Sequence, residues 1–147
     1  MTTVDFAKER YWDDVQVGDC LPDISLVLDA TAMVLQVSGS QDWSPVHHDL
    51  AFAKDSGIPT IFYNTGWTTG VLGRLLTDWM GSSGWVQTLS FQMRGMNAHG
   101  TQVIAHGKVI DKRIEADNAL VDVEIHLEND QAGITTPGKA TIRLPRK

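Results

Sequence analysis

The stretch VDVEIHLE, residues 121–128, alternates apolar with polar residues and predicts the class of fold. Alternation with a period of two is typical of a β-strand that turns one face to the core and the other to water. The same period recurs in residues 89–93 and 140–144. Residues 101–111 predict one more strand, with a turn near 116–118 before the next. Four successive strands with short connections favour an antiparallel sheet.

Residues 62–80 are the longest candidate for a helix, because their apolar residues recur every three or four positions. The apolar face consists of Trp67, Val71, Leu72, Leu75, Leu76 and Trp79. Gly66, Gly70 and Gly73 lie in the same segment, and each glycine costs a helix about 1 kcal/mol relative to alanine. That cost indicates either close packing of the helix backbone against a sheet or ligand, or a partly frayed helix. A long helix and an antiparallel sheet predict an α+β architecture, with the helix covering one sheet face.

The first half of the chain reads as helical and irregular. Residues 24–29, ISLVLD, predict an opening strand. Asp29 or Thr31 then caps a short helix that continues to about Ser38. The predicted buried stripe of this helix consists of Met33, Val34 and Val37.

The chain has 147 residues, 42% of them hydrophobic and 20% charged, which predicts one soluble domain over residues 1–147. A net charge of −6 argues against a general affinity for nucleic acid or anionic lipid. The first ten residues contain no apolar run, and no stretch is apolar for the roughly 18 residues of a membrane span. With a single cysteine, Cys20, no internal disulfide can form, so we expect a cytoplasmic protein. Cys20 as a nucleophile is an alternative, but no neighbour is expected to lower its pKa.

A predicted loop over residues 39–49 holds the densest group of ionisable side chains, DWSPVHHD at 42–49. Pro45 is expected to keep this segment extended, and a turn would bring Asp42 and His47 towards one point. A carboxylate and an imidazole beside one water can activate it and handle a second proton. Asp42 and His47 are therefore the candidate acid/base pair.

The other polar residues of this loop have simpler explanations. Asp49 is expected to cap a helix from Leu50 to about Asp55, with His48 as a surface neighbour. A metal site would group His47, His48 and Asp49 with His99 or His106. No His-x-His or Cys-x-x-Cys spacing supports it, so no metal ion is predicted.

The sequence resembles the MaoC-like, type 2 (R-specific) enoyl-CoA hydratases over nearly its whole length. The loop resembles their D-x-N-P-x-H signature. The segments that carry the resemblance are YWDDVQVGD (11–19), SGSQDWSPVHHD (38–49), IFYN (61–64), VLGRLLTDWMG (71–81) and GKATIRLP (138–145). Within the family, the segments at 38–49, 61–64 and 71–81 look most like the small subunits of actinobacterial steroid side-chain hydratases.

This resemblance implies a hot-dog fold, in which an antiparallel sheet wraps around one central helix. It implies that Asp42 and His47 are the catalytic pair and that Ser44 and Val46 between them contact substrate. Ser44 stands where the family has Asn, which shortens or removes a side-chain hydrogen bond within the loop.

The resemblance also implies an oxyanion site at the start of the central helix. Asn64 and Thr65 stand where the family has a His-Gly pair, and Gly66 follows. Free N–H groups at a helix N-terminus are suitable donors to a thioester carbonyl. Arg94 is a candidate for the coenzyme A phosphates. Lys112 and Arg113 are further candidates, with solvated charges at strand ends as the alternative.

The activity implied is reversible hydration of a trans-2-enoyl-CoA, with the coenzyme A thioester as substrate and no other cofactor. A homodimer, or a heteromer with a second MaoC-like subunit, is the expected assembly. Two other functions remain open: a hot-dog acyl-CoA thioesterase, and a non-catalytic acyl-CoA-binding subunit of a heteromeric hydratase.

Overall fold

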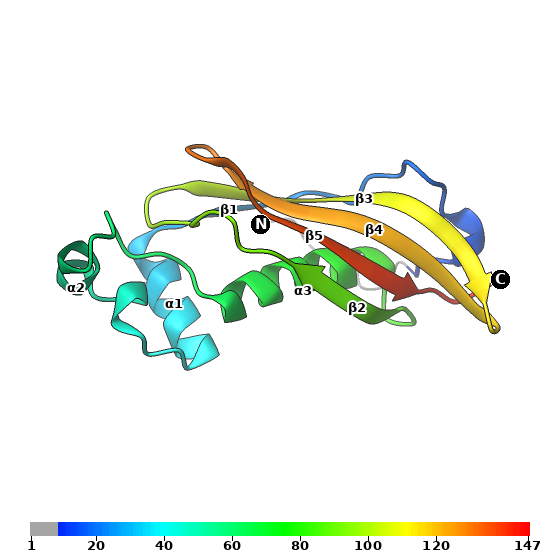
Figure 1. Cartoon of the computed structure of the whole chain (residues 1–147). Helices are drawn as coiled ribbons and strands as arrows, with labels where there is room; N and C mark the ends of the chain where they lie inside the picture. The colour runs from blue at the N-terminus through cyan, green and yellow to red at the C-terminus, as the bar shows by residue number, and fades with distance from the viewer. Residues whose placement is uncertain (1–8) are drawn as a thin grey trace.

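The computed structural model describes residues 9–147, which form one antiparallel sheet curved around one long helix (Figure 1). The strands are β1 (Ile24–Val27), β2 (Trp85–Phe91), β3 (Gln102–Glu115), β4 (Asn118–Asn129) and β5 (Gly133–Arg143), in the spatial order β1-β3-β4-β5-β2. The helices are α1 (Ala30–Ser40), α2 (Leu50–Asp55) and α3 (Thr65–Met80), with short 3-10 turns at Trp12–Asp14 and Pro45–His47. This α+β arrangement is the hot-dog fold that the sequence predicts.

The core lies between α3 and the concave face of the sheet. From β4, the four apolar residues of the alternating stretch are fully buried against the helix: Val121, Val123, Ile125 and Leu127. From α3, the buried side chains are Thr68, Val71, Leu72, Leu75, Leu76, Trp79 and Met80. Burial of this apolar area is the main force that holds helix and sheet together.

The sheet curves because its ladders are interrupted. Register shifts fall at Val109/Asp111 in β3, at Val86/Thr88 in β2, and opposite Leu127/Glu128 of β4, where the extra residue is Thr135 of β5. Such bulges bend a strand and increase its twist. At Gly138 the two strands β5 and β2 approach so closely that a Cβ atom would lie 2.6 Å from the Ser90 carbonyl oxygen.

Several predicted boundaries differ from the structure. The first strand ends at Val27, and the long helix begins at Thr65 rather than at residue 62. Helix α1 continues to Ser40, beyond the predicted Ser38, with Asp29 as its cap through a 2.8 Å bond from the Ala32 N–H. The predicted turn between β3 and β4 is correct, and its two central residues, at 116 and 117, both have positive φ, as in tight hairpin turns.

One prediction about packing is wrong, and a second holds at one of three glycines. Val34 is 63% exposed, and the buried face of α1 is completed by Gln36 instead. Gly70 and Gly73 do not lie against other backbone, because a Cβ atom at either position would meet nothing within 4 Å. Of the three glycines in α3, only Gly66 is crowded, since its Cβ would lie 3.0 Å from the Ser40 Cβ.

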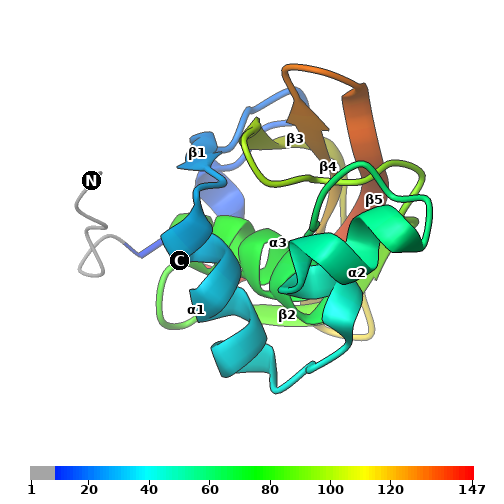
Figure 2. The same cartoon turned by 90° about the vertical axis from the view of Figure 1, so that its left-hand side faces the viewer.

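Helices α1 and α2 gather at one end of the molecule, around the amino end of α3 (Figure 2). The strands β3 and β4 continue to the other end, where they turn (Figure 1). None of the helices within residues 9–147 has the length and apolarity required to span a bilayer. The sequence prediction that the first ten residues contain no apolar run rests partly on residues 1–8, which lie outside the described range.

Candidate active site

The loop between α1 and α2 brings Asp42 and His47 together. Asp42 Oδ2 lies 3.4 Å from His47 Nε2. The imidazole is sheltered, with 10% of its side chain exposed, whereas 42% of the Asp42 side chain is accessible. The pair therefore sits at the edge of the protein interior, open to solvent on the carboxylate side.

The orientation of the His47 ring is fixed from its far side. Its Nδ1 atom lies 2.8 Å from the carbonyl oxygen of Phe62. Because a carbonyl can only accept, Nδ1 carries the proton, and in the neutral ring the lone pair of Nε2 faces Asp42. The Phe62 ring packs edge-on against the imidazole at a centroid distance of 4.9 Å.

The local fold of the loop differs from the extended segment that the sequence predicts. Ser44 does avoid a helical conformation, with ψ at 126°, but residues 45–47 form a 3-10 turn. The His47 N–H donates to the Ser44 carbonyl at 3.0 Å, and this turn directs the imidazole back towards Asp42. The Ser44 N–H lies 3.3 Å from Asp42 Oδ1, so the backbone of Ser44 orders the carboxylate. Val46, half-buried, belongs to the same turn.

The amino end of α3 lies beside this loop. Asn64 is the cap: its Oδ1 accepts from the Trp67 N–H at 2.8 Å, and its Nδ2 donates to Ser40 Oγ at 2.6 Å. The N–H groups of Thr65 and Gly66 have no acceptor among residues 9–147. Such free donors, at the positive end of the helix dipole, can bind an oxygen that gains negative charge.

Gln36 connects the loop with the amino end of α3. Its Nε2 lies 3.4 Å from the His47 carbonyl oxygen, and its Oε1 lies 3.4 Å from the Asn64 backbone nitrogen. The side chain is buried between them. Sequence analysis missed this residue. A polar residue three positions after Met33, on the apolar face of a helix, was the available signal.

A pocket of about 510 Å³ opens between α1 and α3, next to these residues. Most of its lining is apolar or lacks a side chain: Ala32, Leu35, Gly39, Tyr63, Gly66, Trp67, Gly70 and Val71. Gln36, Ser40 and Arg74 complete it. Asp42 and His47 do not line the pocket; it adjoins the pair through Gln36 and Ser40, which contact the loop.

Tyr63 lines this pocket and carries a polar atom without a partner. The residue is 1% exposed, and its hydroxyl has no hydrogen-bond partner among residues 9–147. Burial, followed by the nearby Asp29 carboxylate, raises the pKa of Tyr63 well above its ordinary value. The phenol is therefore protonated at neutral pH and able to donate.

The cations predicted to bind phosphate lie in different settings. Arg94 is exposed and donates to Gln92 Oε1 at 2.8 Å. Lys112 Nζ donates to the Trp12 and Val15 carbonyls and lies over the Trp12 indole. Lys112 thus holds the segment around Trp12 and Val15 in place. The structure does not support its predicted role as a phosphate ligand.

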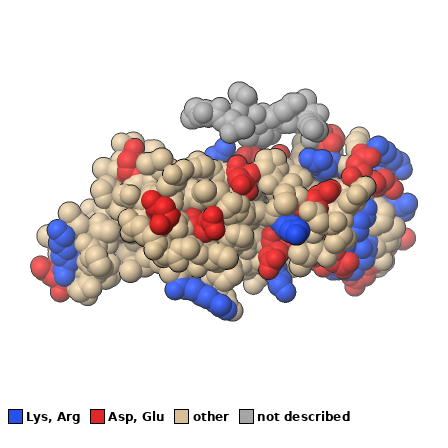
Figure 3. Space-filling model, turned by 90° about the horizontal axis from the view of Figure 1, so that it is seen from above, with Lys and Arg blue, Asp and Glu red and all other residues tan. Residues whose placement is uncertain are grey.

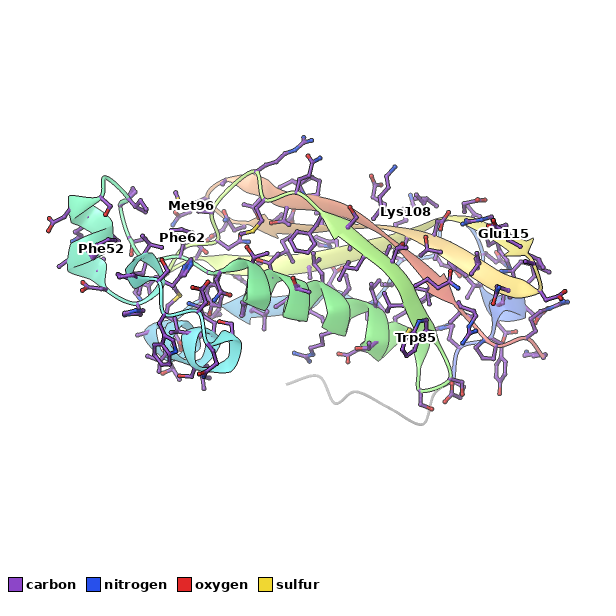
Figure 4. All side chains as sticks on the ribbon, turned by 60° about the horizontal axis from the view of Figure 1, so that its bottom comes forward. Phe52, Phe62, Trp85, Met96, Lys108 and Glu115 are labelled. Atoms are coloured by element: carbon purple, nitrogen blue, oxygen red, sulfur yellow. The ribbon has the colours of Figure 1, made fainter. Side chains whose placement is uncertain are left out.

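Arg113 is engaged in the same manner. It is hydrogen bonded to Glu115 and Asp122 on neighbouring strand positions. Glu115 and Phe62 lie at opposite ends of the molecule (Figure 4), so Arg113 does not serve the pair in its own subunit. Charged side chains of both signs gather at the end of the molecule where β3 and β4 turn, on the right in Figure 3.

The remaining candidates from the sequence are accounted for locally. His48 Nε2 lies 3.2 Å from the Trp43 carbonyl oxygen, and Asp49 caps α2 through the Phe52 N–H at 3.0 Å. Both groups are thus directed to backbone atoms rather than to a common point. Cys20 is exposed and unpaired within the described range.

Comparison with known proteins identifies one curated relative. The 3-oxo-4,17-pregnadiene-20-carboxyl-CoA hydratase beta subunit of Mycobacterium tuberculosis is 34% identical over 77 residues, which cover 52% of this chain. The match spans 60% of the length of that relative. No family model matches the sequence.

Solved structures match over nearly the whole chain. A chain of the ChsH1-ChsH2 complex from M. tuberculosis superposes with a TM-score of 0.80 at 25% identity, covering 88% of this chain and 98% of that one. The R-hydratase PhaJ1 from Pseudomonas aeruginosa gives a TM-score of 0.80 at 16% identity, with coverages of 93% and 86%. A MaoC-like dehydratase from Rhodospirillum rubrum gives 0.78 at 18% identity, with coverages of 94% and 98%. The last two likenesses establish the fold.

Proposed function

We propose that this chain is a MaoC-like hydro-lyase subunit that adds water reversibly to a trans-2-enoyl-CoA, on a hot-dog fold that it shares with an R-hydratase and a MaoC-like dehydratase. The product is a 3-hydroxyacyl-CoA. The observation that carries the proposal is the approach of Asp42 Oδ2 to His47 Nε2 at 3.4 Å, with the imidazole fixed by the Phe62 carbonyl.

The chemistry follows from the protonation of this pair. Neutral His47 turns an acceptor towards the acceptor oxygens of Asp42, so a water between them can donate one hydrogen to each. The water oxygen bonds to C3 of the substrate as one of its protons passes to the pair. The electrons of the double bond move to the thioester oxygen. A proton from the pair then goes to C2, which restores the pair.

The amino end of α3 is the proposed site for the thioester oxygen. The free N–H groups of Thr65 and Gly66 would stabilise the negative charge that the oxygen acquires before C2 is protonated. Gln36 bonds to both the His47 and Asn64 backbones. It therefore keeps the water-activating pair and the oxyanion donors in register, which such a reaction requires.

The pocket between α1 and α3 is the proposed compartment for the acyl group. Its volume, about 510 Å³, lies in the range of pockets that enclose drug-sized ligands, about 300–1,000 Å³. The M. tuberculosis relative is named for a pregnadiene-carboxyl-CoA, which supports a bulky acyl group. The unpaired Tyr63 hydroxyl would donate to a polar atom of that group.

A second subunit is part of the proposal. One similar chain comes from a two-component complex, and the curated relative is named a beta subunit. In this chain, Val34 and Leu35 on α1 are apolar and exposed, and Leu35 lines the pocket. A partner that covers this surface would enclose the acyl compartment.

The test is the loss of enoyl-CoA absorbance in the ultraviolet, with short-chain and steroidal thioesters, and with or without a candidate partner subunit. Asp42→Asn and His47→Ala should each lower hydration by orders of magnitude, and the double variant should be little worse, because the two groups act as a unit. His48→Ala, at the exposed neighbouring imidazole, is the control and should remain close to wild type. Circular dichroism confirms that each variant folds.

If both single variants keep activity within tenfold of wild type, the assignment is wrong. Release of free thiol from saturated acyl-CoA, measured in parallel, would indicate a thioesterase instead. Binding of acyl-CoA without any turnover, even in the presence of the partner, would indicate a non-catalytic subunit.

A further inference from the structure

A second cluster of ionisable groups lies on the outer face of the sheet, away from α3. His106 on β3 and His126 on β4 are directly opposite each other in the antiparallel register. Their ring centroids are 4.9 Å apart. Glu128 follows two positions later on the same face of β4, and Asp23 immediately precedes β1. Four side chains from three neighbouring segments thus converge.

The distances within this cluster match those of a metal site. The ligand atoms of His106, His126 and Glu128 all lie within 4.8 Å of one another. His106 Nε2 and Glu128 Oε1 are 3.2 Å apart. Ligand atoms of a tetrahedral zinc site, with bonds of about 2.0–2.1 Å, are separated by about 3.3 Å. The His106–Glu128 separation therefore fits a shared metal ion, and the His126 ligand atom lies within 4.8 Å of both.

We propose that His106, His126 and Glu128 bind a divalent transition-metal ion of the zinc class, with water completing the coordination. Two imidazoles and one carboxylate are ligands that Zn²⁺ accepts readily. Their placement on paired strands makes the site rigid, because the backbone positions are fixed by the ladder.

Asp23 provides the outer contact that such a site needs. Its Oδ1 lies 2.8 Å from His106 Nδ1. With the Nδ1 proton donated to Asp23, the Nε2 lone pair of His106 is directed to the metal position. A carboxylate behind a metal-binding imidazole fixes the ring and strengthens it as a ligand.

The electrostatics favour a cation at this point. The carboxylates of Asp23 and Glu128 both lie against the His106 imidazole, so two negative groups flank the proposed metal position. The nearby Glu124 faces Lys108 and Lys139 across the ladders, which places it among cations rather than in the ligand set. Asp23 and Glu128 are left to balance the metal charge.

This site is separate from the acid/base pair. His106 and His126 alternate with residues that are fully buried against α3, so they lie on the opposite side of the sheet from the helix and its pocket. Bound metal would join β3 and β4 to the segment before β1. We expect it to stabilise the fold.

Isothermal titration of the full chain, without an affinity tag, with Zn²⁺ tests the proposal. One equivalent should bind, and His106→Gln, His126→Gln and Glu128→Gln should each weaken binding more than tenfold. Asp23→Asn, which removes only the outer contact, should weaken it by about 10- to 100-fold. His99→Gln, an exposed histidine outside the cluster, is the matched control and should bind as wild type does.

A second measurement identifies the ligands directly. The chain has five histidines, and in NMR spectra of the imidazoles Zn²⁺ should shift only the signals of His106 and His126. No saturable binding to the wild type would overturn the proposal. So would equal weakening by His99→Gln, or shifts confined to His47 and His48. These outcomes are independent of hydratase activity.

Discussion

Gln36 illustrates how one buried amide organises a site that it does not line with reactive atoms. Its two hydrogen bonds run to backbone groups on separate segments, the His47 carbonyl and the Asn64 N–H. Both bonds are long, at 3.4 Å, so their strength is modest. Their value lies in the geometry, because they add a direct link between the loop and the start of α3 to the contacts that Ser40 and the Phe62 carbonyl make.

Replacing Gln36 by Leu should therefore affect both stability and catalysis. The variant leaves two buried polar groups without a partner and should lose about 1–3 kcal/mol of unfolding free energy. In the proposed reaction, kcat should fall more than KM rises, because positioning is lost rather than binding. Chemical denaturation and steady-state kinetics measure the two effects, with Gln87→Leu, at an exposed glutamine of β2, as the control. An unchanged kcat would show that Gln36 has no positioning role.

Removing the Tyr63 hydroxyl should stabilise the free protein but weaken its use of a bulky acyl-CoA. Because its buried hydroxyl has no partner within the described residues, Tyr63→Phe removes a desolvation cost and should raise the melting temperature of the free protein. The same change should raise KM for a bulky acyl-CoA that carries an oxygen on its ring system, relative to KM for crotonyl-CoA. Tyr11→Phe is the control. A lower melting temperature would show that the hydroxyl is already bonded in solution, for instance to a water.

At the level of single residues, the sequence predicts the acid/base pair but not its support. Asp42 and His47 are recognisable because their loop resembles a family signature with a carboxylate, a proline and an imidazole at the same spacing. Gln36 and the Phe62 carbonyl are not, since one is an ordinary polar residue and the other is a backbone atom whose role is independent of residue type. Contacts between segments that are distant in sequence leave no local pattern.

Among the elements, α3 has two functions, and its glycines reflect both. Its buried face holds the sheet, while Gly66 and Gly70 line the pocket. At Gly66, a Cβ atom would lie 3.0 Å from the Ser40 Cβ, so glycine permits α1 to approach. At Gly70 the space is open. That glycine keeps volume available rather than allowing close packing.

Substitution of Gly70 by Leu should fill part of this pocket. The helix itself should gain up to about 1 kcal/mol, because leucine is a far better helix former than glycine. For the proposed reaction, kcat/KM for a steroidal thioester should fall at least tenfold relative to that for crotonyl-CoA. Gly73→Leu tests whether the effect is specific to the pocket, since Gly73 does not line it. Equal loss with both substrates would mean that the acyl group binds elsewhere.

The elements themselves were predicted with uneven success, for identifiable reasons. Strong alternation located β4, and a cap-to-glycine pattern located α2 to the residue. The loop at 45–47 was misjudged, because proline restricts its own φ and the preceding residue but permits a 3-10 turn after it. The sequence does not distinguish Gly66, which is closely packed, from Gly70 and Gly73, where a Cβ atom would meet nothing within 4 Å, because a helix can carry glycine for several reasons.

For the whole molecule, the exposed apolar residues of α1 indicate an incomplete surface. The sequence predicts Val34 to be core, yet it is 63% exposed in the single subunit, and Leu35 beside it is 65% exposed. The predicted burial of Val34 and its exposure in the single subunit agree if a second subunit covers this helix. The apolar pattern of α1 then reflects an assembly rather than the isolated chain.

Val34→Glu should weaken that assembly. Light scattering after size-exclusion chromatography should give a smaller mass for the variant than for the wild type, alone or mixed with its partner subunit. A charge in the interface would need to be desolvated on association, which is costly. Val17→Glu, at an exposed valine in the segment before β1, is the control. An identical mass for Val34→Glu and wild type would exclude α1 from the interface.

The overall architecture could be predicted because it depends on local periodicity and on the order of the elements. A helix followed by four strands has few ways to bury its apolar faces, and the sheet wrapped around α3 is one of them. The position of α1 against α3, the pocket between them and the cluster on the outer face could not be predicted. Each depends on curvature and register that arise only when the strands pair.

Strand β4 carries the core on one face and the histidine–carboxylate cluster on the other. A slip of one residue in its pairing would exchange these faces completely, placing His126, Glu124 and Glu128 against the helix and Val121 and Val123 in water. Such misregistered forms are penalised twice, by lost apolar burial and by buried charge. The alternation along this strand therefore favours one register, and the metal binding proposed above, which needs His106 opposite His126, would report whether a refolded preparation has found that alignment.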